Sequence, residues 1–323
     1  MSGHLWMRKW KILVVDAQDN EALNVSDLRV VFNVKRSREA ASFATVEIYN
    51  LTADTEQRII KEGDRVIIEA GYEGYLETSA DGTIQETQAK QYGKIFDGQV
   101  VYPRRRKENN TDYVLSLLCI DGNNPLRLNF VAKTLNKGLN QRQVLQAVCD
   151  KSQTKIPTNT ITQGLSGQQL PRGKVIFGEP KDCIGDIARG NGASYWIEDG
   201  MLNMTRLTDV AQDEAIVVTP TTGLIGTPSQ TQYGASFRLL LNPAIKMKSL
   251  VQIKNSEINE AQSQPGSNQS ALDPDWIYQV IEVTHHGDTT GNDWYTECNG
   301  VSRYGVGALP ALLSNAAQNP NGV

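Results

Sequence analysis

The order of hydrophobic runs and polar insertions repeats in this sequence, and the repeat constrains the fold more than any single motif does. The first copy surrounds a polar insertion at 73–92, with its runs at Val66–Ile68, Ile95–Tyr102 and Tyr113–Asp121. The second copy surrounds an insertion at 255–274, with its runs at Leu250–Ile253, Ile277–Thr284 and Asp293–Val301. Short runs rich in β-branched and aromatic residues between polar loops are typical of strands. The repeat predicts two similar β domains, although any two unrelated β domains share part of such a pattern.

The segment between the two copies has a different periodicity. Val144, Leu145 and Val148 recur at helical spacing within Asn140–Lys151, and Pro180–Arg189 has a second apolar face. The dipeptide Asp199-Gly200 separates two further hydrophobic runs and is a strong hairpin signal, because both turn positions need a positive φ. We therefore expect a small α+β domain in the middle of the chain.

A chain of 323 residues exceeds the usual size of one hydrophobic core, so several domains are expected. The predicted fold is mainly β with an α+β insert, in which two similar tube-like β-barrel domains flank a small α+β domain. Residues 1–125 form the first barrel domain, 126–214 the α+β domain, 215–304 the second barrel domain and 305–323 a flexible C-terminal tail. A short helix is also expected at Thr52–Lys61, and both polar insertions are expected at the surface.

Composition argues against several classes of protein. The net charge is −4, whereas a general nucleic-acid binder carries a basic stripe, so no specific nucleic-acid partner is expected. No apolar run is long enough to span a bilayer, and the N-terminus lacks the pattern of a signal peptide, which predicts cytoplasmic synthesis. The four cysteines lack C-x-x-C spacing. We expect them to be reduced and mostly buried, with neither a zinc site nor a disulfide framework.

A basic run, Arg104, Arg105, Arg106 and Lys107, is the first candidate contact region. Four adjacent cations in a loop could contact phosphate or an acidic partner surface. A solvated loop balanced by nearby carboxylates is the simpler interpretation, since charge runs are common on exposed faces. We interpret the run as a loop at a barrel end, where a protein partner could dock.

The cluster His285, His286 and Asp288 is the second candidate. These residue types could ligate a metal, or form a general base with an orienting carboxylate. Adjacent residues on an extended chain point to opposite faces, so only one histidine can easily join a site with Asp288. We interpret the cluster as a hydrogen-bonded loop at a barrel end and predict no catalytic, metal-binding or cofactor-binding residue.

The sequence lacks Gly-x-Ser-x-Gly, His-Glu-x-x-His and P-loop motifs, and its three histidines make a nucleophilic triad hard to assemble. We therefore predict that the protein is not an enzyme. One alternative is a cell-wall glycoside hydrolase, whose Asp/Glu pair would be defined in space rather than in sequence. Another is a carbohydrate-binding β module, because exposed tryptophans stack on sugars. Against the second alternative, strand placement predicts that Trp196 and Trp294 are core residues.

Several short segments resemble the hub proteins of bacteriophage tail baseplates. These proteins form the family of hubs similar to late control protein D, and they are related to the hub part of secretion-spike proteins. In the first 125 residues these segments are EIYNL at 47–51, GDRVIIEAGY at 63–72 and IFDGQV at 95–100. In the last third they are GLIGTP at 223–228, LLNP at 240–243 and VTHHGDTTGNDWYT at 283–296. The resemblance spans about residues 10–304 in order, and the insertions at 73–92 and 255–274 are less familiar.

The resemblance implies a structural baseplate subunit that forms a homotrimeric ring with two tube-like barrels per chain. Three chains with two similar domains each present six near-equivalent positions, so the ring can join a six-fold tail tube to a three-fold central spike or tip. The implied partners are further copies of the chain, the tail tube or tube-initiator protein, a separate spike or tip protein, the tape measure and other baseplate proteins. The implied location is the virion tail baseplate, after synthesis in the host bacterial cytoplasm.

Overall fold

The computed structural model describes residues 4–15, 22–38, 41–52, 63–78, 84–88, 91–109, 111–121, 129–162, 165, 169–206, 209, 215–231, 234–253, 260–261 and 276–302. Apart from Thr52, the predicted helix at Thr52–Lys61 lies outside these residues, as do the predicted flexible tail at 305–323 and most of the insertion at 255–274. The other insertion, at 73–92, lies largely in a hairpin between two strands of the first domain.

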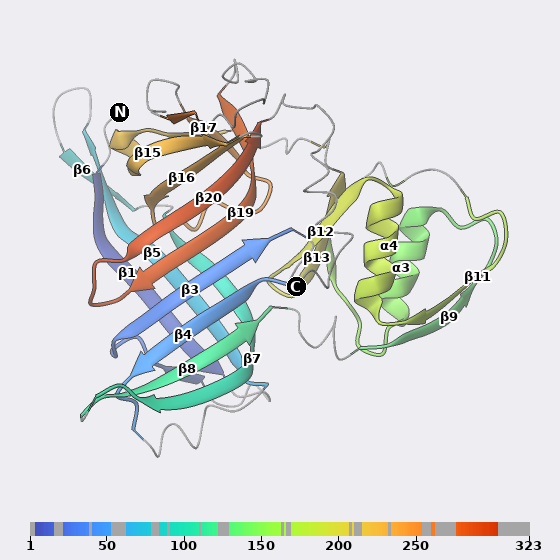
Figure 1. Cartoon of the computed structure of the whole chain (residues 1–323), viewed down its shortest axis with the longest axis horizontal. Coiled ribbons are helices and arrows are strands. Elements are labelled where there is room, and N and C mark those ends of the chain that lie inside the picture. Colours follow the sequence, from blue (N-terminus) through green and yellow to red (C-terminus); the bar gives the residue numbers. More distant parts are fainter. Residues whose placement is uncertain are drawn as a thin grey trace.

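One mixed sheet of fifteen strands contains the first and last thirds of the chain. The N-terminal half of this sheet consists of β1 (His4–Val15), β2 (Ala22–Asn24), β3 (Val30–Ser37), β4 (Phe43–Tyr49), β5 (Arg65–Thr78), β6 (Ile84–Gln88), β7 (Tyr92–Lys107) and β8 (Tyr113–Ile120). The C-terminal half consists of β14 (Ile216–Val218), β15 (Leu224–Thr231), β16 (Gly234–Leu240), β17 (Leu250–Ile253), β18 (Glu260–Ala261), β19 (Ile277–Asp288) and β20 (Trp294–Ser302), with the 3-10 turn η1 (Pro220–Thr222) before β15. In Figure 1 the two halves lie one above the other, and the middle of the chain forms a separate body beside them.

Six strands in each half follow the same order in space. The N-terminal half reads β3-β4-β8-β7-β5-β1, and the C-terminal half reads β15-β16-β20-β19-β17-β14. The six strands also occur in the same order along the chain in both halves. The one difference in direction is at the end of each series, where β1 is antiparallel to β5 but β14 is parallel to β17. The repeat seen in the sequence thus corresponds to a repeat of topology.

The pairing irregularities of β7 and β19 fall at the same place in this repeat. β7 shifts register against β8 between Val100 and Tyr102, and β19 shifts register against β20 between Val280 and Glu282. A bulge inserts a residue at one point of a strand, so it marks equivalent positions in two copies of a sheet. Val100 and Val280 are therefore equivalent, and the strand ends 102–107 and 282–287 correspond residue by residue.

The backbone beside these two valines is also the same. The carbonyl of Val100 accepts a hydrogen bond from the Gly63 amide at 2.8 Å, and the carbonyl of Val280 accepts one from the Lys248 amide at 2.9 Å. Gly63 has a φ of 96° and Lys248 a φ of 69°. Positive φ is uncommon for a residue with a Cβ, so the conformation at Lys248 is set by the surrounding sheet rather than by its own preference.

β3 and β19 join the two halves into one sheet. They pair antiparallel from Ser37 opposite Glu282 to Val31 opposite Asp288. Among the described strands, the hydrogen-bonded path ends at β18 on one side and β2 on the other, and neither half closes into a ring. The prediction of a mainly β fold is confirmed, whereas the prediction of two tube-like barrels is not.

The middle module consists of β9 (Val131–Leu135), α3 (Gln141–Lys151), β10 (Thr158–Ile161), β11 (Lys174–Gly178), α4 (Pro180–Gly190), β12 (Ala193–Glu198) and β13 (Met201–Arg206). Asn140 begins α3 with a capping box, in which its side chain accepts from the Gln143 amide. Both predicted helices are confirmed, as is the hairpin at Asp199-Gly200, whose residues have φ values of 55° and 75°. The buried side chains of this module form a hydrophobic cluster of their own.

Candidate functional site

The basic residues predicted in a loop lie instead in the last part of β7. Arg104, Arg105, Arg106 and Lys107 pair antiparallel with Ser116, Leu115, Val114 and Tyr113 of β8. β8 is anchored in the core by Val114, Leu115 and Leu117 and extends the ladder beside the basic run, which explains why these polar residues are strand rather than loop. Arg104, Arg105 and Lys107 are exposed, and Arg106 is half-buried.

The basic run is held by contacts within its own half of the sheet. Arg106 donates to the Glu47 carboxylate on β4 at 3.0 Å, in an ion pair whose two side chains are 40% and 31% exposed. The cations of Arg105 and Lys107 lie over the ring of Tyr113, 4.7 Å and 5.7 Å from its centroid. Exposed pairs of this kind contribute about 0–1 kcal/mol, so they orient the side chains without fixing them rigidly.

The residues of the histidine cluster likewise lie in a strand, the last part of β19, rather than in a loop. His285 is fully buried, and its Nδ1 is 2.9 Å from the hydroxyl of Thr296. Burial lowers the pKa of His285 to about 3, with the nearby Arg36 charge acting in the same direction. The ring is therefore neutral at physiological pH and belongs to the core of the sheet.

His286 and Asp288 turn to other partners. The His286 ring stacks on Tyr295 with centroids 4.7 Å apart, and its Nε2 is 3.6 Å from the Glu297 carboxylate. Asp288 accepts from the Arg29 guanidinium at 2.8 Å and from the Thr290 amide at 3.0 Å. Burial opposes ionisation of Asp288, but these hydrogen bonds outweigh it and lower its pKa to about 2.

The histidine cluster therefore does not form one site. Its three residues face three different sets of partners, and the described part of the chain contains no group of three or more His, Cys, Asp or Glu residues placed to hold a metal ion. All four cysteines are free, and Cys119, Cys149 and Cys298 are buried, as expected from their hydrophobic character. Trp196 and Trp294 are core residues, as predicted.

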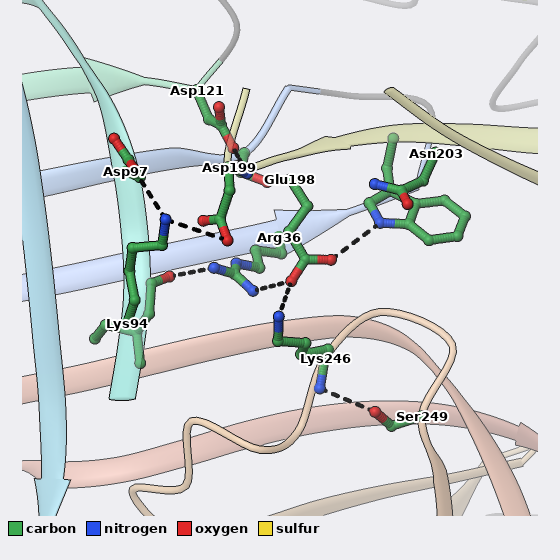
Figure 2. A network of polar contacts seen from close by, with 12 residues as sticks. Arg36, Lys94, Asp97, Asp121, Glu198, Asp199, Asn203, Lys246 and Ser249 are labelled. Atoms are coloured by element: carbon green, nitrogen blue, oxygen red, sulfur yellow. Dashed lines mark hydrogen bonds and ion pairs between the residues drawn. The ribbon is translucent and has the colours of Figure 1, made fainter. Parts of the chain in front are cut away.

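A polar junction that the sequence did not reveal connects the sheet with the middle module (Figure 2). Arg36, on β3, is 3% exposed and donates to the Glu198 carboxylate at 2.9 Å and to the Ile95 carbonyl at 2.6 Å. Lys246, which precedes β17, also contacts Glu198, at 3.0 Å. The two cations lower the pKa of Glu198 in spite of its burial. One carboxylate from the module thus binds cations from both halves of the sheet.

The same junction anchors the β12–β13 turn through a carboxylate. Asp121, which follows β8, accepts from the amides of Asp199 and Gly200, both at 2.8 Å. Burial raises the pKa of Asp121 to about 7, although the two amide hydrogen bonds act in the opposite direction. Beside the turn, Lys94 of β7 bridges Asp97 at 3.0 Å and Asp199 at 3.5 Å (Figure 2). The residues that join this junction are far apart in the sequence, so no local pattern predicts it.

The described residues therefore contain two features relevant to function. One is the polar junction, which fixes the middle module to the sheet. The other is the pair of equivalent strand ends, 102–107 on β7 and 282–287 on β19. On one side they pair with equivalent strands, β8 and β20. On the other side 282–287 pairs with β3, whereas no described strand pairs with 102–107. No helix in the described ranges is both long enough and apolar enough to cross a bilayer.

Comparison with protein families gives one match, to the family described as Baseplate hub gp41, over residues 13–264. This match covers more than half of the chain. No curated protein matches it.

Solved structures with a similar fold include two bacterial tail proteins. The 43 kDa tail protein of prophage MuSo2 from Shewanella oneidensis has a TM-score of 0.57 at 11% identity, over 92% of this chain and 98% of that chain. The tail protein from Neisseria meningitidis MC58 has a TM-score of 0.55 at 10% identity, over 90% of this chain and 96% of that chain. The E. coli c3393 protein, described as a component of the type VI secretion system, has a TM-score of 0.51 at 7% identity, over 92% and 78%. At these identities the likeness is one of fold.

Proposed function

The chain belongs to the Baseplate hub gp41 family, and from this premise we propose that it is a structural hub subunit of a phage tail baseplate that forms a homotrimeric ring. The ring joins the six-fold tail tube to a three-fold central spike or tip. Family membership is the observation that carries this proposal. The repeated strand order supports it, because three chains with two similar half-sheets supply six similar positions.

The hub acts through protein interfaces and not through catalysis. Its two half-sheets become tube-like barrels in the ring, where edges that are open in one chain are covered by the next. Its partners are other copies of the chain, the tail tube or tube-initiator protein, a spike or tip protein, the tape measure and other baseplate proteins. It is made in the host cytoplasm and resides in the virion tail baseplate.

Of the two predicted contact regions, the basic end of β7 is the better candidate for a partner surface. Its side chains are exposed and its ion pair is weak. His285 and Asp288 are already engaged by Thr296 and Arg29, so their part of β19 acts within the chain.

The polar junction gives the hub its mechanical continuity. Buried charge pairs contribute little net stability, but removing one partner is strongly destabilising, and they hold two surfaces in one geometry. Glu198 binds Arg36 and Lys246, so a force on the middle module is transmitted to both half-sheets.

The test is the solution mass of the purified chain by light scattering, followed by electron microscopy of the same peak. A mass near three times the 35.6 kDa of one chain, with ring-shaped particles, is the expected result. A stable dimer would contradict the proposal. A single-chain mass that persists after mixing with the tail tube and spike proteins of the same phage would contradict it as well.

A further inference from the structure

The outer edge of β7 is open beyond Val100. Up to that residue β7 pairs with β5, and the Val100 amide donates to the Asp64 carbonyl at 2.8 Å. From Tyr102 to Lys107 the described strands provide a partner on one side, β8, and none on the other. Tyr102 is 60% exposed at this edge. Pro103 lies here too, which fits an edge, because proline cannot donate to a ladder in the middle of a sheet.

The equivalent edge of β19 is covered. Residues 282–287 pair with β20, the counterpart of β8, on one side and with β3 on the other, so Thr284 faces Lys35 and His286 faces Asn33. Lys35 also forms an ion pair with Glu282 across this joint. The chain thus contains, within itself, an example of how the first strand of one spatial series, β3, pairs with the fourth strand of the other, β19.

β15 is the counterpart of β3 in the C-terminal half. Asn33 faces Thr45 on β4, and Ser229 faces Ser236 on β16, at the same distance from the bulge in each half. Ser229 is therefore equivalent to Asn33, and the outer edge of β15 is equivalent to the edge that β3 presents to β19. In one chain this edge carries β18, which pairs with it through two residues.

We propose that the open edge of β7 takes the β15 strand of a second copy of this chain, antiparallel, in the register that β3 has on β19. In that register Arg106 faces Ser229, as His286 faces Asn33. The inference rests on the proposed function, since it specifies how the copies in the ring meet.

A second copy is required because the two strands cannot meet within one chain. β15 lies at the upper end of the C-terminal half and β7 at the lower end of the N-terminal half (Figure 1). A contact between different surfaces of identical chains is heterologous, and it generates a closed ring when the rotation between copies closes. Each new joint then repeats the β3–β19 joint, so all half-sheets in the ring have the same neighbours.

The two-residue strand β18 occupies the place on β15 that β19 occupies on β3. Proteins protect sheet edges from indiscriminate pairing, and a short strand is one such protection. β18 therefore gives way when the longer β7 edge of the next copy arrives. Pro103 has a similar effect on β7, because it removes one donor without blocking the residues that follow it.

The test is a cysteine pair in the full chain, Arg106→Cys with Ser229→Cys, under mild oxidation. Residues directly opposite each other in an antiparallel pair have Cβ atoms about 4.5–5.5 Å apart, close to what a disulfide needs. The expected result is a ladder of covalent dimers and trimers on a denaturing gel. The matched control is Tyr102→Cys with Ser229→Cys, whose first cysteine lies roughly 13 Å from position 106 along the regularly paired part of β7, at about 3.3 Å per residue, and is expected to give monomers.

Other outcomes separate this inference from the proposed function. Particles that have the mass of three chains but give no cross-linked dimers and trimers on the gel would overturn the β7–β15 pairing. The proposed hub ring would not be contradicted by that result. A ladder of equal yield in the control pair would also overturn it, because the register would then be wrong. A chain that shows neither self-association nor cross-links would overturn the pairing, and binding to the spike protein would decide the proposed function separately.

Discussion

The ends of β7 and β19 occupy the same place in two similar half-sheets, yet one is covered and the other is open. At the start of β20, Trp294 is 2% exposed and packs edge-on against Phe32 of β3, with ring centroids 5.5 Å apart. Its counterpart at the start of β8, Tyr113, is 40% exposed and is overlaid by the cations of Arg105 and Lys107. The difference lies in the neighbours rather than in the strands themselves.

Because the sheet is duplicated, two equivalent edges, one on β7 and one on β19, can each pair with the first strand of a series. Among the described strands of one chain, just the edge of β19 is paired in this way. β3 fills the place beside β19, and with it the C-terminal half contributes Leu241 and Trp294 to the core of the N-terminal half. The place beside β7 carries polar and basic residues, which keep an open edge soluble and discourage uncontrolled pairing.

The largest expected effect comes from breaking the polar junction at the covered joint. Glu198→Ala leaves the Arg36 guanidinium buried without its carboxylate, and we expect a loss of about 3–5 kcal/mol in the free energy of unfolding in urea. The matched control, Glu47→Ala, removes the carboxylate from the more exposed Arg106 at the open strand, with an expected loss of about 0–1 kcal/mol. Equal losses from both variants would contradict the contrast between the two strand ends.

The next effect sharpens the comparison at two equivalent positions. A Cβ at Gly287 would lie 2.2 Å from the Phe32 ring, which is itself buried. Gly287→Val therefore forces the β3–β19 joint apart, at about 2–3 kcal/mol. Lys107→Val, at the corresponding position of β7, faces open space and should change the unfolding free energy of the single chain by about 0.5 kcal/mol or less. A cost at Lys107 as large as at Gly287 would show that the β7 edge is covered in the single chain.

An effect that is smaller per pH unit appears as a pH dependence of stability. His285 has an ordinary pKa of 6.5 and a folded pKa of about 3, so the unfolded chain binds a proton first and stability falls as pH drops from about 6.5 towards 3. Asp121 has an ordinary pKa of 3.8 and a folded pKa of about 7, so its contribution is fully present below about 4 and is lost as pH rises to 7. Between about pH 4 and 6.5 the two dependences oppose each other.

Each group is therefore revealed by replacing the other. Relative to the unmodified chain, His285→Gln should become progressively more stable as pH falls from 6.5 to 4, by up to about 1.4 kcal/mol per pH unit. Asp121→Asn should become progressively less stable over the same range. Urea unfolding at several pH values measures both slopes, and slopes of the same sign in the two variants would contradict the assignment.

The smallest effect concerns the open edge alone. Tyr102→Ser replaces a ring that is 60% exposed, so the unfolding free energy of the single chain should change by about 0.5 kcal/mol or less. The same substitution should weaken self-association, since the ring lies on the edge assigned to the next copy. Thermal unfolding and light scattering of the same sample measure the two effects, and a change in stability without a change in mass would contradict the role of this edge.

Local patterns in the sequence predicted the strands, both helices and the hairpin turn, because periodicity, caps and turn residues act over a few neighbouring positions. The same patterns misplaced the ends of β7 and β19. Arg104–Lys107 and His285–Asp288 look like loop sequences, and they are strand because β8 and β20 extend the ladder beside them. Tertiary pairing overrode local preference there.

The joint and the polar junction could not be predicted in this way. Nothing in β3 indicates that it pairs with a strand about 250 residues later, and the partner of Arg36 is 162 residues away. From sequence, an arginine in an alternating strand is expected at the surface. The burial of Arg36 is explained by its ion pair with Glu198, a carboxylate that also binds Lys246. The resemblance of short segments to baseplate hubs was confirmed by the family match, while the paired barrels were not.

Hydrogen–deuterium exchange on the assembled protein tests the central claim most directly, because it compares the two equivalent strand ends in one sample. The account predicts that peptides covering 102–107 and 282–287 are both protected in the assembly. On dilution to single chains, 102–107 should lose protection while 282–287 keeps it. Rapid exchange of 102–107 in particles that have the mass of three chains would contradict the account.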